Sequence, residues 1–501
     1  MSEELKDIPP TEIQDQTASY RSIFKATSLF GGVQVYQILI GVIKSKFIAI
    51  LLGPAGMGIQ GLYQSTLDLI KSLSAFGLEQ SAIRDISEAN GSGDNQQIGK
   101  TVATVRKLVW LTGLLGLSIT LFLSPMLSKL TFGNSDYTWG FVILSSTLLI
   151  NQLCAGQKVL LQGMRRLKDL AKASAIGSTV GLLFSIPIYY WIGVDGIVPT
   201  MVLTSITALL LSWFYSRRIK IVAPHVTIRQ AVHEGRSMIK MGIAMSASGI
   251  LVTFCAYILR WYIRQQGSVE DVGLFTAGFV IVNTYVGMVF SAMGTDYYPR
   301  LATVNKDNKK CQELINQQGE IALLIIAPII VSCIIIMPIL IKIIYSEAFL
   351  PANNFIMFAV IGVFFKAISW VVSYCFLAKA ESRLFVINET VTNIYTLGLY
   401  FLGYYLGGLS GLGISFAIGY FIYMVQVIWI SRVRYNFHLN YSFISVLFVQ
   451  LVFVGMSLVL KLILKTSMFY LLGSILFVIC LAYSLISLDR RIQLTQLFGK
   501  K

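Results

Sequence analysis

The stretch IALLIIAPIIVSCIIIMPILI, residues Ile321–Ile341, contains no charged side chain. The hydrocarbon core of a bilayer is about 30 Å thick and a helix rises 1.5 Å per residue, so roughly 20 mostly apolar residues can cross it. A water-soluble domain rarely holds so long a run without a polar face. The stretch therefore predicts a membrane-spanning helix.

Runs of this kind recur along almost the whole chain of 501 residues. Hydrophobic residues make up 55% and charged residues 13%, whereas a soluble domain carries roughly 25% charged residues. The predicted fold class is an all-α integral membrane protein with about 14 transmembrane helices. The predicted spans are Ser28–Leu52, Ile59–Ile83, Val102–Leu123, Trp139–Leu161, Ala171–Trp191, Ile197–Tyr215, Met241–Ile263, Val272–Met293, Ile321–Ile341, Phe355–Leu377, Leu384–Leu406, Leu412–Ile430, Phe443–Leu464 and Met468–Ile486.

The net charge of +16 could indicate a nucleic-acid-binding protein, but the basic residues gather in loops beside the hydrophobic spans. With a cytoplasmic N-terminus, most of the 40 Lys and Arg residues fall in cytoplasmic loops, which is the bias of the positive-inside rule. Such loops face anionic membrane lipids. We therefore expect a multi-pass protein of the bacterial cytoplasmic (inner) membrane, with both termini in the cytoplasm and no nucleic-acid partner.

The ends of the chain and one central loop divide the predicted spans into groups. The first 22 residues are polar, with no apolar segment typical of a removable signal peptide. The central loop contains IRQAVHEGRSMIK, which predicts a short amphipathic helix on the inner surface. The predicted segments are a cytoplasmic tail at 1–22, six spans in 23–215, an amphipathic linker at 216–240, six spans in 241–430, two extra spans in 431–487 and a basic cytoplasmic tail at 488–501.

Two segments, one in each group of six spans, resemble each other. Placing Gly53 on Gly267 aligns Lys46 with Arg260, and one inserted residue then aligns Gly58 with Gly273. Each segment joins basic residues late in a helix to a short glycine-containing turn. Internal repeats of this type build many transporters, although chance similarity between apolar segments is the alternative.

Charged residues inside the spans are the most informative ones. A charge near the bilayer centre costs at least about 2.5 kcal/mol on insertion scales, so it usually faces a bundle interior or a hydrated cavity. The second, tenth and eleventh spans each place polar residues along one helix face. These three polar stripes are Gln64, Asp68, Lys71 and Glu79; Lys366, Ser369 and Ser373; and Glu389, Thr392, Asn393 and Thr396. Stripes that face one another would line an aqueous cavity.

Clustered Lys and Arg in such a cavity match a pyrophosphate group, because charge-assisted hydrogen bonds are strong and guanidinium binds phosphate with two donors. Snorkelling or internal ion pairs remain the alternative, above all for Lys158, Lys342 and Lys461 near helix ends and for the neighbours Asp68 and Lys71. The candidate substrate-binding residues are Lys44, Lys46, Lys71, Arg260, Arg264 and Lys366. The candidate ion-coupling residues are Asp68, Glu79 and Asp296.

Neither a cofactor nor a metal site is expected. The six cysteines form no close pair of the kind found in metal or redox motifs, so we interpret them as packing residues without disulfides. The three histidines lie in predicted cytoplasmic loops, and paired carboxylates suited to sugar chemistry are missing outside the membrane. The cysteines are Cys154, Cys255, Cys311, Cys333, Cys375 and Cys480, and the histidines are His225, His233 and His438.

Three local motifs carry a resemblance to a known family. They are IKSKFIAILLGPAGMGIQGLYQS after the first span, GLEQSAIRDISEA closing the second, and YYPRLATVNKD closing the eighth, where Pro299 and Arg300 match a Pro-basic-Leu pattern. At these residues the chain resembles the polysaccharide flippases of the multidrug/oligosaccharidyl-lipid/polysaccharide exporter superfamily, especially O-antigen translocases. The resemblance covers most of the chain in helix number and spacing.

This resemblance implies two six-helix bundles around a central cavity plus two C-terminal helices. It also implies alternating access, with outward movement of an undecaprenyl-diphosphate-linked glycan to polysaccharide polymerase machinery. In the related lipid II flippases a cavity Arg falls where Lys44 stands here, so the resemblance assigns a headgroup-binding role to Lys44. The two extra helices are shared with that lipid II branch.

Two alternatives remain open. A multidrug or cation antiporter of the same superfamily would look alike in sequence, although it should favour acidic, aromatic cavity walls over basic ones. A membrane polysaccharide polymerase or ligase is the enzymatic alternative, but no predicted outer loop is long enough for a domain that acts on sugars. We therefore expect a transporter and not an enzyme.

Overall fold

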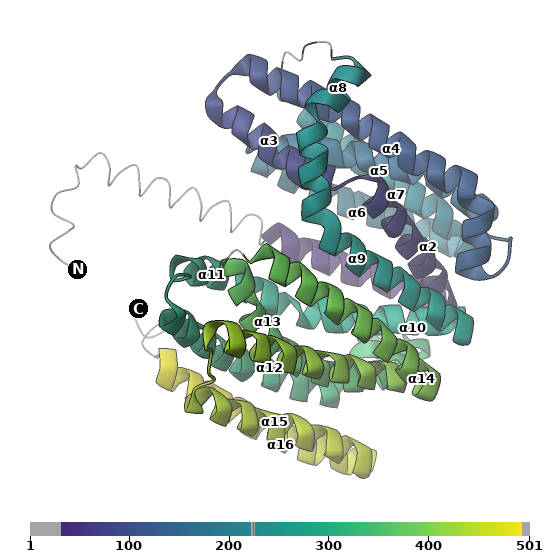
Figure 1. Cartoon of the computed structure of the whole chain (residues 1–501). Helices are drawn as coiled ribbons and strands as arrows, with labels where there is room; N and C mark the ends of the chain where they lie inside the picture. Colours follow the sequence, from purple (N-terminus) through teal and green to yellow (C-terminus); the bar gives the residue numbers. More distant parts are fainter. Residues whose placement is uncertain (1–31, 222–223, 225, 380, 493–501) are drawn as a thin grey trace, which may run out of the picture. The chain divides into compact units, whose positions relative to one another are not determined.

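A computed structural model describes residues 32–221, 224, 226–379 and 381–492, and all regular structure among these residues is helical (Figure 1). Eleven of the described helical segments are long and apolar enough to cross a membrane. Two of them, Leu167–Ser216 and Arg383–Tyr435, each contain two predicted spans, and the second predicted span corresponds to a further helix, α2. When these two segments are counted as two spans each and α2 is added, all 14 predicted spans correspond to described helices. The chain is therefore an all-α, multi-pass membrane protein.

The chain divides into two compact units. Unit 1 contains the described residues up to Leu52 and Thr66–Ile250, whereas unit 2 contains Gly53–Ser65 and the described residues from Leu251 onward. Two helices, α2 and α9, therefore run from one unit into the other. The boundary between the units that lies in the middle of the chain is inside α9. The predicted segments, with an amphipathic linker at 216–240, stay a prediction.

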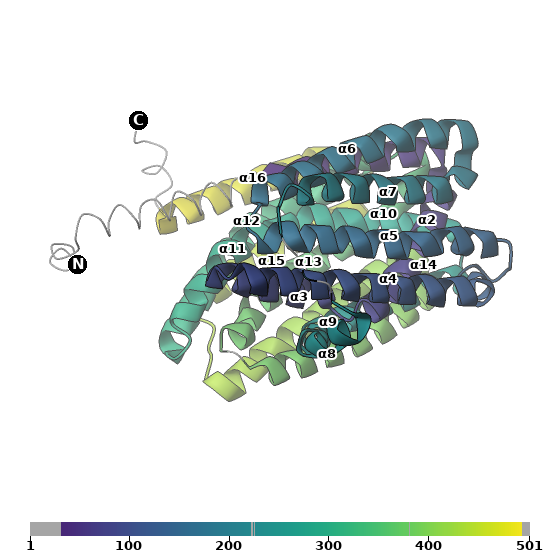
Figure 2. The same cartoon turned by 90° about the horizontal axis from the view of Figure 1, so that it is seen from above.

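Unit 1 is built around neighbouring long helices. Helix α5 contacts both α4 and α7, and α7 contacts α6, so that these four lie in a row in Figure 2. The elements that lie wholly or partly in unit 1 are a helix over Gly32–Leu51, α2 (Gly53–Ser74), α3 (Leu78–Ser92), α4 (Asn95–Phe132), α5 (Thr138–Gly163), α6 (Leu167–Ile192), the short turn η1 (Gly193–Gly196), α7 (Ile197–Ser216), α8 (Ile228–Glu234) and α9 (Arg236–Gln266).

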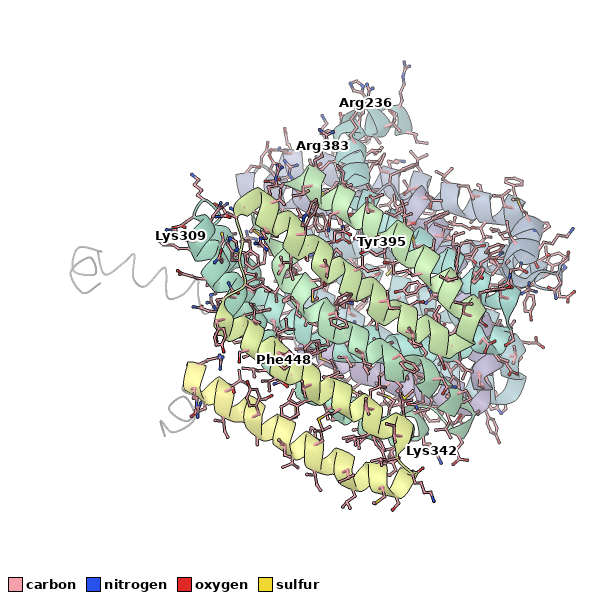
Figure 3. All side chains as sticks on the ribbon, turned by 60° about the horizontal axis from the view of Figure 1, so that its bottom comes forward. Arg236, Lys309, Lys342, Arg383, Tyr395 and Phe448 are labelled. Carbon is pink, nitrogen blue, oxygen red and sulfur yellow. The ribbon has the colours of Figure 1, made fainter. Side chains whose placement is uncertain are left out.

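Unit 2 is centred on α13, whose side chains are largely buried. Helix α12 contacts α13 on one side and α15 and α16 on the other, and Lys309 and Lys342 mark the two ends of α12 in Figure 3. The elements after α9 are α10 (Val269–Val280), the π-helix η2 (Ile281–Val286), α11 (Met288–Thr303), α12 (Asn308–Ile344), η3 (Glu347–Ala352), α13 (Asn353–Ala378), α14 (Ser382–Tyr435), α15 (Tyr441–Ile463) and α16 (Thr466–Ile492).

The second predicted span extends too far along the chain. Helix α2 ends at Ser74, because Phe76 and Gly77 adopt positive φ angles of 50° and 61°, which a right-handed helix cannot contain. Glu79 therefore lies in the first turn of a separate helix, α3. The polar stripe that we expected from Gln64 to Glu79 is wrong beyond Lys71.

The amphipathic linker helix is shorter than the sequence suggests. Helix α8 spans only seven residues and begins with a capping box, in which the Thr227 side chain accepts from the Gln230 backbone while the Gln230 side chain accepts from the Thr227 backbone. Arg236 already opens α9. Ile228 and Val232 of α8 are exposed, as an interfacial helix requires.

Helix α14 is a hairpin of two antiparallel arms, 382–406 and 409–435. The chain reverses at Gly407 and Gly408, whose backbone angles are not helical. Hydrogen bonds join residues far apart in sequence across the arms: the Gln426 side chain donates to Asn388 Oδ1 over 2.7 Å, and the Tyr423 hydroxyl donates to Glu389 Oε1 over 2.7 Å. The two arms correspond to the eleventh and twelfth predicted spans.

The distribution of polar and apolar residues is that of a protein surrounded by lipid. Large apolar side chains point outward from the helices, including Phe448 of α15, which is 66% exposed (Figure 3). Fully buried positions, in contrast, include polar groups such as Ser369 and Gln450. Lipid tails solvate an apolar exterior at no cost, whereas the interior must satisfy the polar groups.

The two segments that the repeat alignment pairs pack against each other inside unit 2. A Cβ atom on Gly58 of α2 would overlap the backbone carbonyl of Val269, and one on Gly273 of α10 would overlap that of Pro54. The two contacts are reciprocal under the alignment of Gly58 with Gly273. We call this contact the glycine seam, and it explains why the first turns of α2 belong to unit 2.

Replacing Gly58 by Ala should destabilise the protein even though Ala is the better helix former. Helix propensity favours Ala by about 1 kcal/mol, but a side chain that meets backbone cannot rotate away, and overpacking of this kind costs typically about 1–3 kcal/mol. Denaturant unfolding in detergent micelles measures the loss. Gly455 of α15 is the matched control, because a Cβ there meets nothing within 4 Å; equal behaviour of Gly58→Ala and Gly455→Ala would contradict the role of the seam.

Candidate binding site

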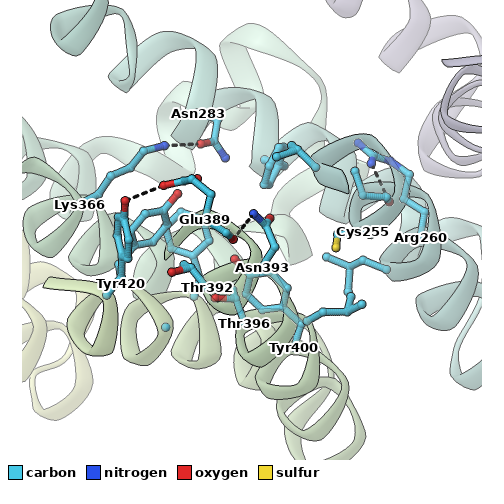
Figure 4. A pocket seen from close by; sticks show the side chains of 18 of the residues that line it. Cys255, Arg260, Asn283, Lys366, Glu389, Thr392, Asn393, Thr396, Tyr400 and Tyr420 are labelled. Carbon is cyan, nitrogen blue, oxygen red and sulfur yellow. Dashed lines mark hydrogen bonds between the residues drawn. The ribbon is translucent and has the colours of Figure 1, made fainter. Parts of the chain in front are cut away.

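A pocket of about 340 Å³ opens inside unit 2. Helices α9, α10, η2 and α13 and both arms of α14 line it (Figure 4). Its walls carry two cationic side chains, Arg260 and Lys366, one carboxylate, Glu389, and six aromatic rings. Charged groups beside apolar rings in a membrane-embedded cavity are typical of a substrate or ion site.

Lys366 reaches the pocket from the middle of α13. Its ammonium donates to Asn283 Oδ1 over 2.8 Å and lies 5.2 Å from the centre of the Tyr420 ring. Both partners are neutral, so the positive charge is stabilised but not cancelled. Ser369 and Ser373, which the spacing aligned with Lys366, are buried and donate to carbonyls of their own helix, and neither lines the pocket.

Asn283 is held by the π-helix η2, in the middle of a span that the sequence predicts as plain α-helix. A single π-helical turn shifts the side chains after it and is frequent at functional sites. The Asn283 Nδ2 atom is buried and finds no acceptor among the described residues. A buried amide donor without an acceptor is costly, so this end of the pocket is suited to a ligand that brings acceptor oxygens.

Arg260 lies at the other end of the pocket from Lys366 (Figure 4). Its Nη1 donates to the Ala256 carbonyl over 3.1 Å, and its guanidinium lies 5.7 Å from the centre of the Phe275 ring. A guanidinium is planar and carries five donors, a geometry that suits the oxygens of a phosphate or carboxylate. Two cations therefore bracket the pocket.

Glu389 lies between these cations, on the first arm of α14 (Figure 4). Its Oε1 accepts from the Tyr423 hydroxyl over 2.7 Å, and Tyr423 in turn accepts from Asn388 Nδ2 over 3.3 Å. Among the described residues its second oxygen, Oε2, accepts no hydrogen bond. All four residues of the predicted stripe line the pocket: Glu389, Thr392, Asn393 and Thr396.

Of the six predicted substrate-binding residues, the structure brings only Arg260 and Lys366 into this pocket. Lys44 and Lys46, on the helix Gly32–Leu51, and Lys71, near the end of α2, are half-buried in unit 1. Arg264 is half-buried in the last turn of α9 and is not among the lining residues.

The candidate ion-coupling residues lie elsewhere. Asp68 of α2 and Glu79 of α3 are exposed residues of unit 1. The backbone of Asp296 belongs to α11, but its side chain lies outside the described residues. The one carboxylate that lines the pocket, Glu389, belonged to a predicted stripe and not to the predicted ion-coupling set.

Neither Asn283 nor the aromatic walls of the pocket could be recognised from the sequence. A π-turn leaves no recognisable period in a uniformly apolar span, and aromatic residues in such spans are equally consistent with packing or lipid contact. We expected acidic, aromatic walls to favour a cation antiporter, and this pocket carries both such walls and two cations. The aromatic lining residues are Phe275, Phe279, Tyr400, Phe416, Tyr420 and Tyr423.

Solved structures similar to this chain establish the class of its fold. The lipid II flippase MurJ in an inward closed conformation aligns with a TM-score of 0.65 at 13% identity, over 93% of this chain and 99% of that one. An inward-facing multidrug resistance MATE family transporter of the MOP superfamily aligns with a TM-score of 0.68 at 15% identity, over 80% and 94%. The chain therefore shares its fold with a flippase and with a transporter of the predicted exporter superfamily.

The chain belongs to the polysaccharide biosynthesis protein family, whose model matches residues 47–354. A curated relative, the lipid III flippase of Escherichia coli (strain K12), is 21% identical over 381 residues, which cover 74% of this chain and 88% of that protein. The corresponding lipid III flippase of Shigella flexneri matches to the same extent. The predicted family is thereby confirmed.

Proposed function

We propose that this protein is a flippase that moves a polyprenyl-diphosphate-linked oligosaccharide from the inner to the outer leaflet of the bacterial cytoplasmic membrane. The observation that carries the proposal is the unit 2 pocket, which is lined by Arg260, Lys366 and the amide of Asn283, whose nitrogen has no acceptor among the described residues. The likeness to flippases of lipid-linked substrates supports it.

A diphosphate suits these donors better than a single carboxylate would. The Lys366 ammonium has three donors, of which Asn283 takes one, and the Arg260 guanidinium can bind phosphate oxygens with two parallel donors. Both cations lie in an environment of low dielectric constant, where their attraction for an anion is stronger than in water.

The membrane potential provides a driving force for this transport. A diphosphate diester carries about two negative charges, and each gains about 2.3 kcal/mol on leaving an interior that is 100 mV negative. Export of the headgroup is then favoured by roughly 4–5 kcal/mol. Ion coupling is therefore not required energetically.

The remaining predicted residues complete the proposal. Lys44, Lys46 and Lys71 of unit 1 and Arg264 of unit 2 contact the headgroup at other stages of an alternating-access cycle, in which the bundles 23–215 and 241–430 rock. Asp68, Glu79 and Asp296 serve any ion coupling. Both termini lie in the cytoplasm, and the exported glycan passes to polymerase machinery.

One observation favours a second candidate, a multidrug or cation antiporter. Glu389 and the aromatic walls of the pocket are suited to an organic cation, because ring faces and a carboxylate both attract positive charge. Two fixed cations in the same pocket oppose that use.

Transport by purified protein in vesicles separates the two functions. We expect a fluorescent polyprenyl-diphosphate oligosaccharide to cross the bilayer in vesicles that contain the protein and not in protein-free vesicles. Its rate should rise when the potential is set negative on the side from which the headgroup leaves. Uptake of organic cations without movement of the lipid-linked sugar would establish the antiporter instead.

A further inference from the structure

We propose that the unit 2 pocket also recognises the sugar attached to the diphosphate, with Glu389 as the residue that determines this preference. The inference rests on the proposed function, since the same pocket must first hold the diphosphate. It goes beyond that function because it assigns the opposite wall of the pocket to a second part of the substrate.

The polar groups of the pocket are divided by chemistry between its walls. Lys366 and Asn283, from α13 and η2, present donors. The first arm of α14 presents acceptors: Glu389 Oε2 accepts nothing from the described residues, and Asn393 uses its Nδ2 to donate to the Glu389 carbonyl over 2.8 Å, which leaves its Oδ1 for a ligand. A ligand that fits both walls presents acceptors to Lys366 and Asn283 and donors to Glu389 and Asn393.

A diphosphate diester alone does not satisfy the acceptor wall. Its oxygens are acceptors, and a carboxylate facing them offers only repulsion, because an ionised carboxylate cannot donate. A sugar joined to the phosphate brings hydroxyl or acetamido N–H donors, which form charge-assisted hydrogen bonds with a carboxylate. Glu389 thus favours the sugar-bearing headgroup and disfavours the same lipid without its sugar.

The aromatic residues beside the acceptor wall provide a surface for a sugar ring. Tyr400 and Phe416 are nearly parallel with ring centres 6.4 Å apart, and Tyr420 follows at 4.8 Å from Phe416. The face of an aromatic ring is negative, so it attracts the weakly positive C–H groups on the flat side of a sugar. The ring hydroxyls at the sugar's edge then point toward Glu389 and Asn393.

The size of the pocket limits how much of the glycan it can hold. Its volume of about 340 Å³ is at the lower end of the range for small-molecule sites, roughly 300–1,000 Å³. That space accommodates a diphosphate with about one sugar ring and not an oligosaccharide. The preference therefore concerns the first sugar.

The test compares two diphosphate diesters of equal charge that differ in the sugar: farnesyl diphosphate capped by a methyl ester on its terminal phosphate, and farnesyl diphosphate that carries one N-acetylhexosamine on that phosphate. Their dissociation constants are measured with the purified full-length protein in lipid nanodiscs. We expect the wild type to bind the sugar-bearing probe about tenfold or more tightly, a typical value for one hydrogen bond to a charged group. Glu389→Ala should bring the ratio of the two constants close to one.

The ratio is the readout because a general change in charge affects both probes alike. Glu270→Ala serves as the matched control, since Glu270 is exposed at the start of α10 and outside the pocket, and it should keep the wild-type ratio. Glu389→Gln preserves the shape of the side chain and one acceptor oxygen, so it should lower the preference for the sugar-bearing probe to a value between those of the wild type and Glu389→Ala. This variant tests the role of Glu389 if Glu389→Ala does not fold.

An unchanged ratio in the Glu389 variants would overturn the sugar-recognition proposal and leave the flippase proposal intact. Wild-type protein that prefers the sugar-free probe would overturn it as well. Failure of the wild type to bind either probe would instead contradict the proposed function, so the two failures are distinguishable.

Discussion

Replacing Lys366 by Ala should weaken binding of a prenyl diphosphate by about 30-fold or more. Removal of one partner from a buried, hydrogen-bonded charge pair costs about 2–5 kcal/mol, and each 1.4 kcal/mol is a factor of ten. The loss includes the hydrogen bond that Lys366 donates to Asn283 over 2.8 Å, so Asn283 would also lose its fixed orientation. Equilibrium binding of farnesyl diphosphate to protein in nanodiscs measures the effect.

The control for this change is another lysine of a membrane helix. Lys342 lies at the end of α12, exposed and paired with Glu347 over 2.6 Å. Lys342→Ala removes the same charge from the protein but not from the pocket, and it should leave binding unchanged. Equal losses in the two variants would show that the total charge of the protein, and not the pocket, attracts the diphosphate.

Replacing Glu320 by Ala should destabilise unit 2 by about 3 kcal/mol. The Glu320 carboxylate of α12 is buried and accepts from Arg491 Nε of α16 over 2.6 Å. Breaking a buried ion pair from one side typically costs about 3–5 kcal/mol, because the other charge remains without its partner. We expect the lower end, since Arg491 also donates to the Ser487 carbonyl and to Ser442 Oγ.

Denaturant unfolding in micelles measures this loss, and an exposed ion pair provides the comparison. Glu347→Ala breaks the pair with Lys342, which stands at the surface of the same helix, and surface pairs contribute little. Similar unfolding midpoints for Glu320→Ala and Glu347→Ala would mean that the ion pair between Glu320 and Arg491 does not stabilise the packing of α16 on α12.

The fold class could be predicted from the sequence because the membrane imposes a simple rule. A span needs enough apolar length and internally satisfied backbone, so runs such as Ile321–Ile341 identify helices without knowledge of their packing. The errors occur where the rule does not apply. The predicted span Ile59–Ile83 includes Glu79, whereas the positive φ angles of Phe76 and Gly77 end the helix before that residue.

The candidate site could be predicted only in part. The stripe around Glu389 was found because a helix repeats every 3.6 residues and four polar positions share one face. Asn283 was missed because a π-turn alters that repeat. The spacing also suggested Ser369 as a neighbour of Lys366, but in an apolar helix a serine can satisfy itself on its own backbone, so a polar residue in a span need not face water.

The repeat alignment identified a contact that composition could not. Gly58 and Gly273 match in sequence, and each meets the backbone of the segment that contains the other. Small residues allow helices to approach closely in membranes, which gives these glycines a physical role in packing α2 against α10 inside unit 2.

Transport of a fluorescent polyprenyl-diphosphate oligosaccharide by wild-type and Arg260→Ala/Lys366→Ala protein, reconstituted side by side at equal amounts in vesicles, tests the central claim most directly. We predict that the wild type moves the headgroup across the bilayer and that the double variant, although folded, falls close to the rate of protein-free vesicles. A double variant that transports as fast as the wild type would contradict the claim that this pocket holds the diphosphate.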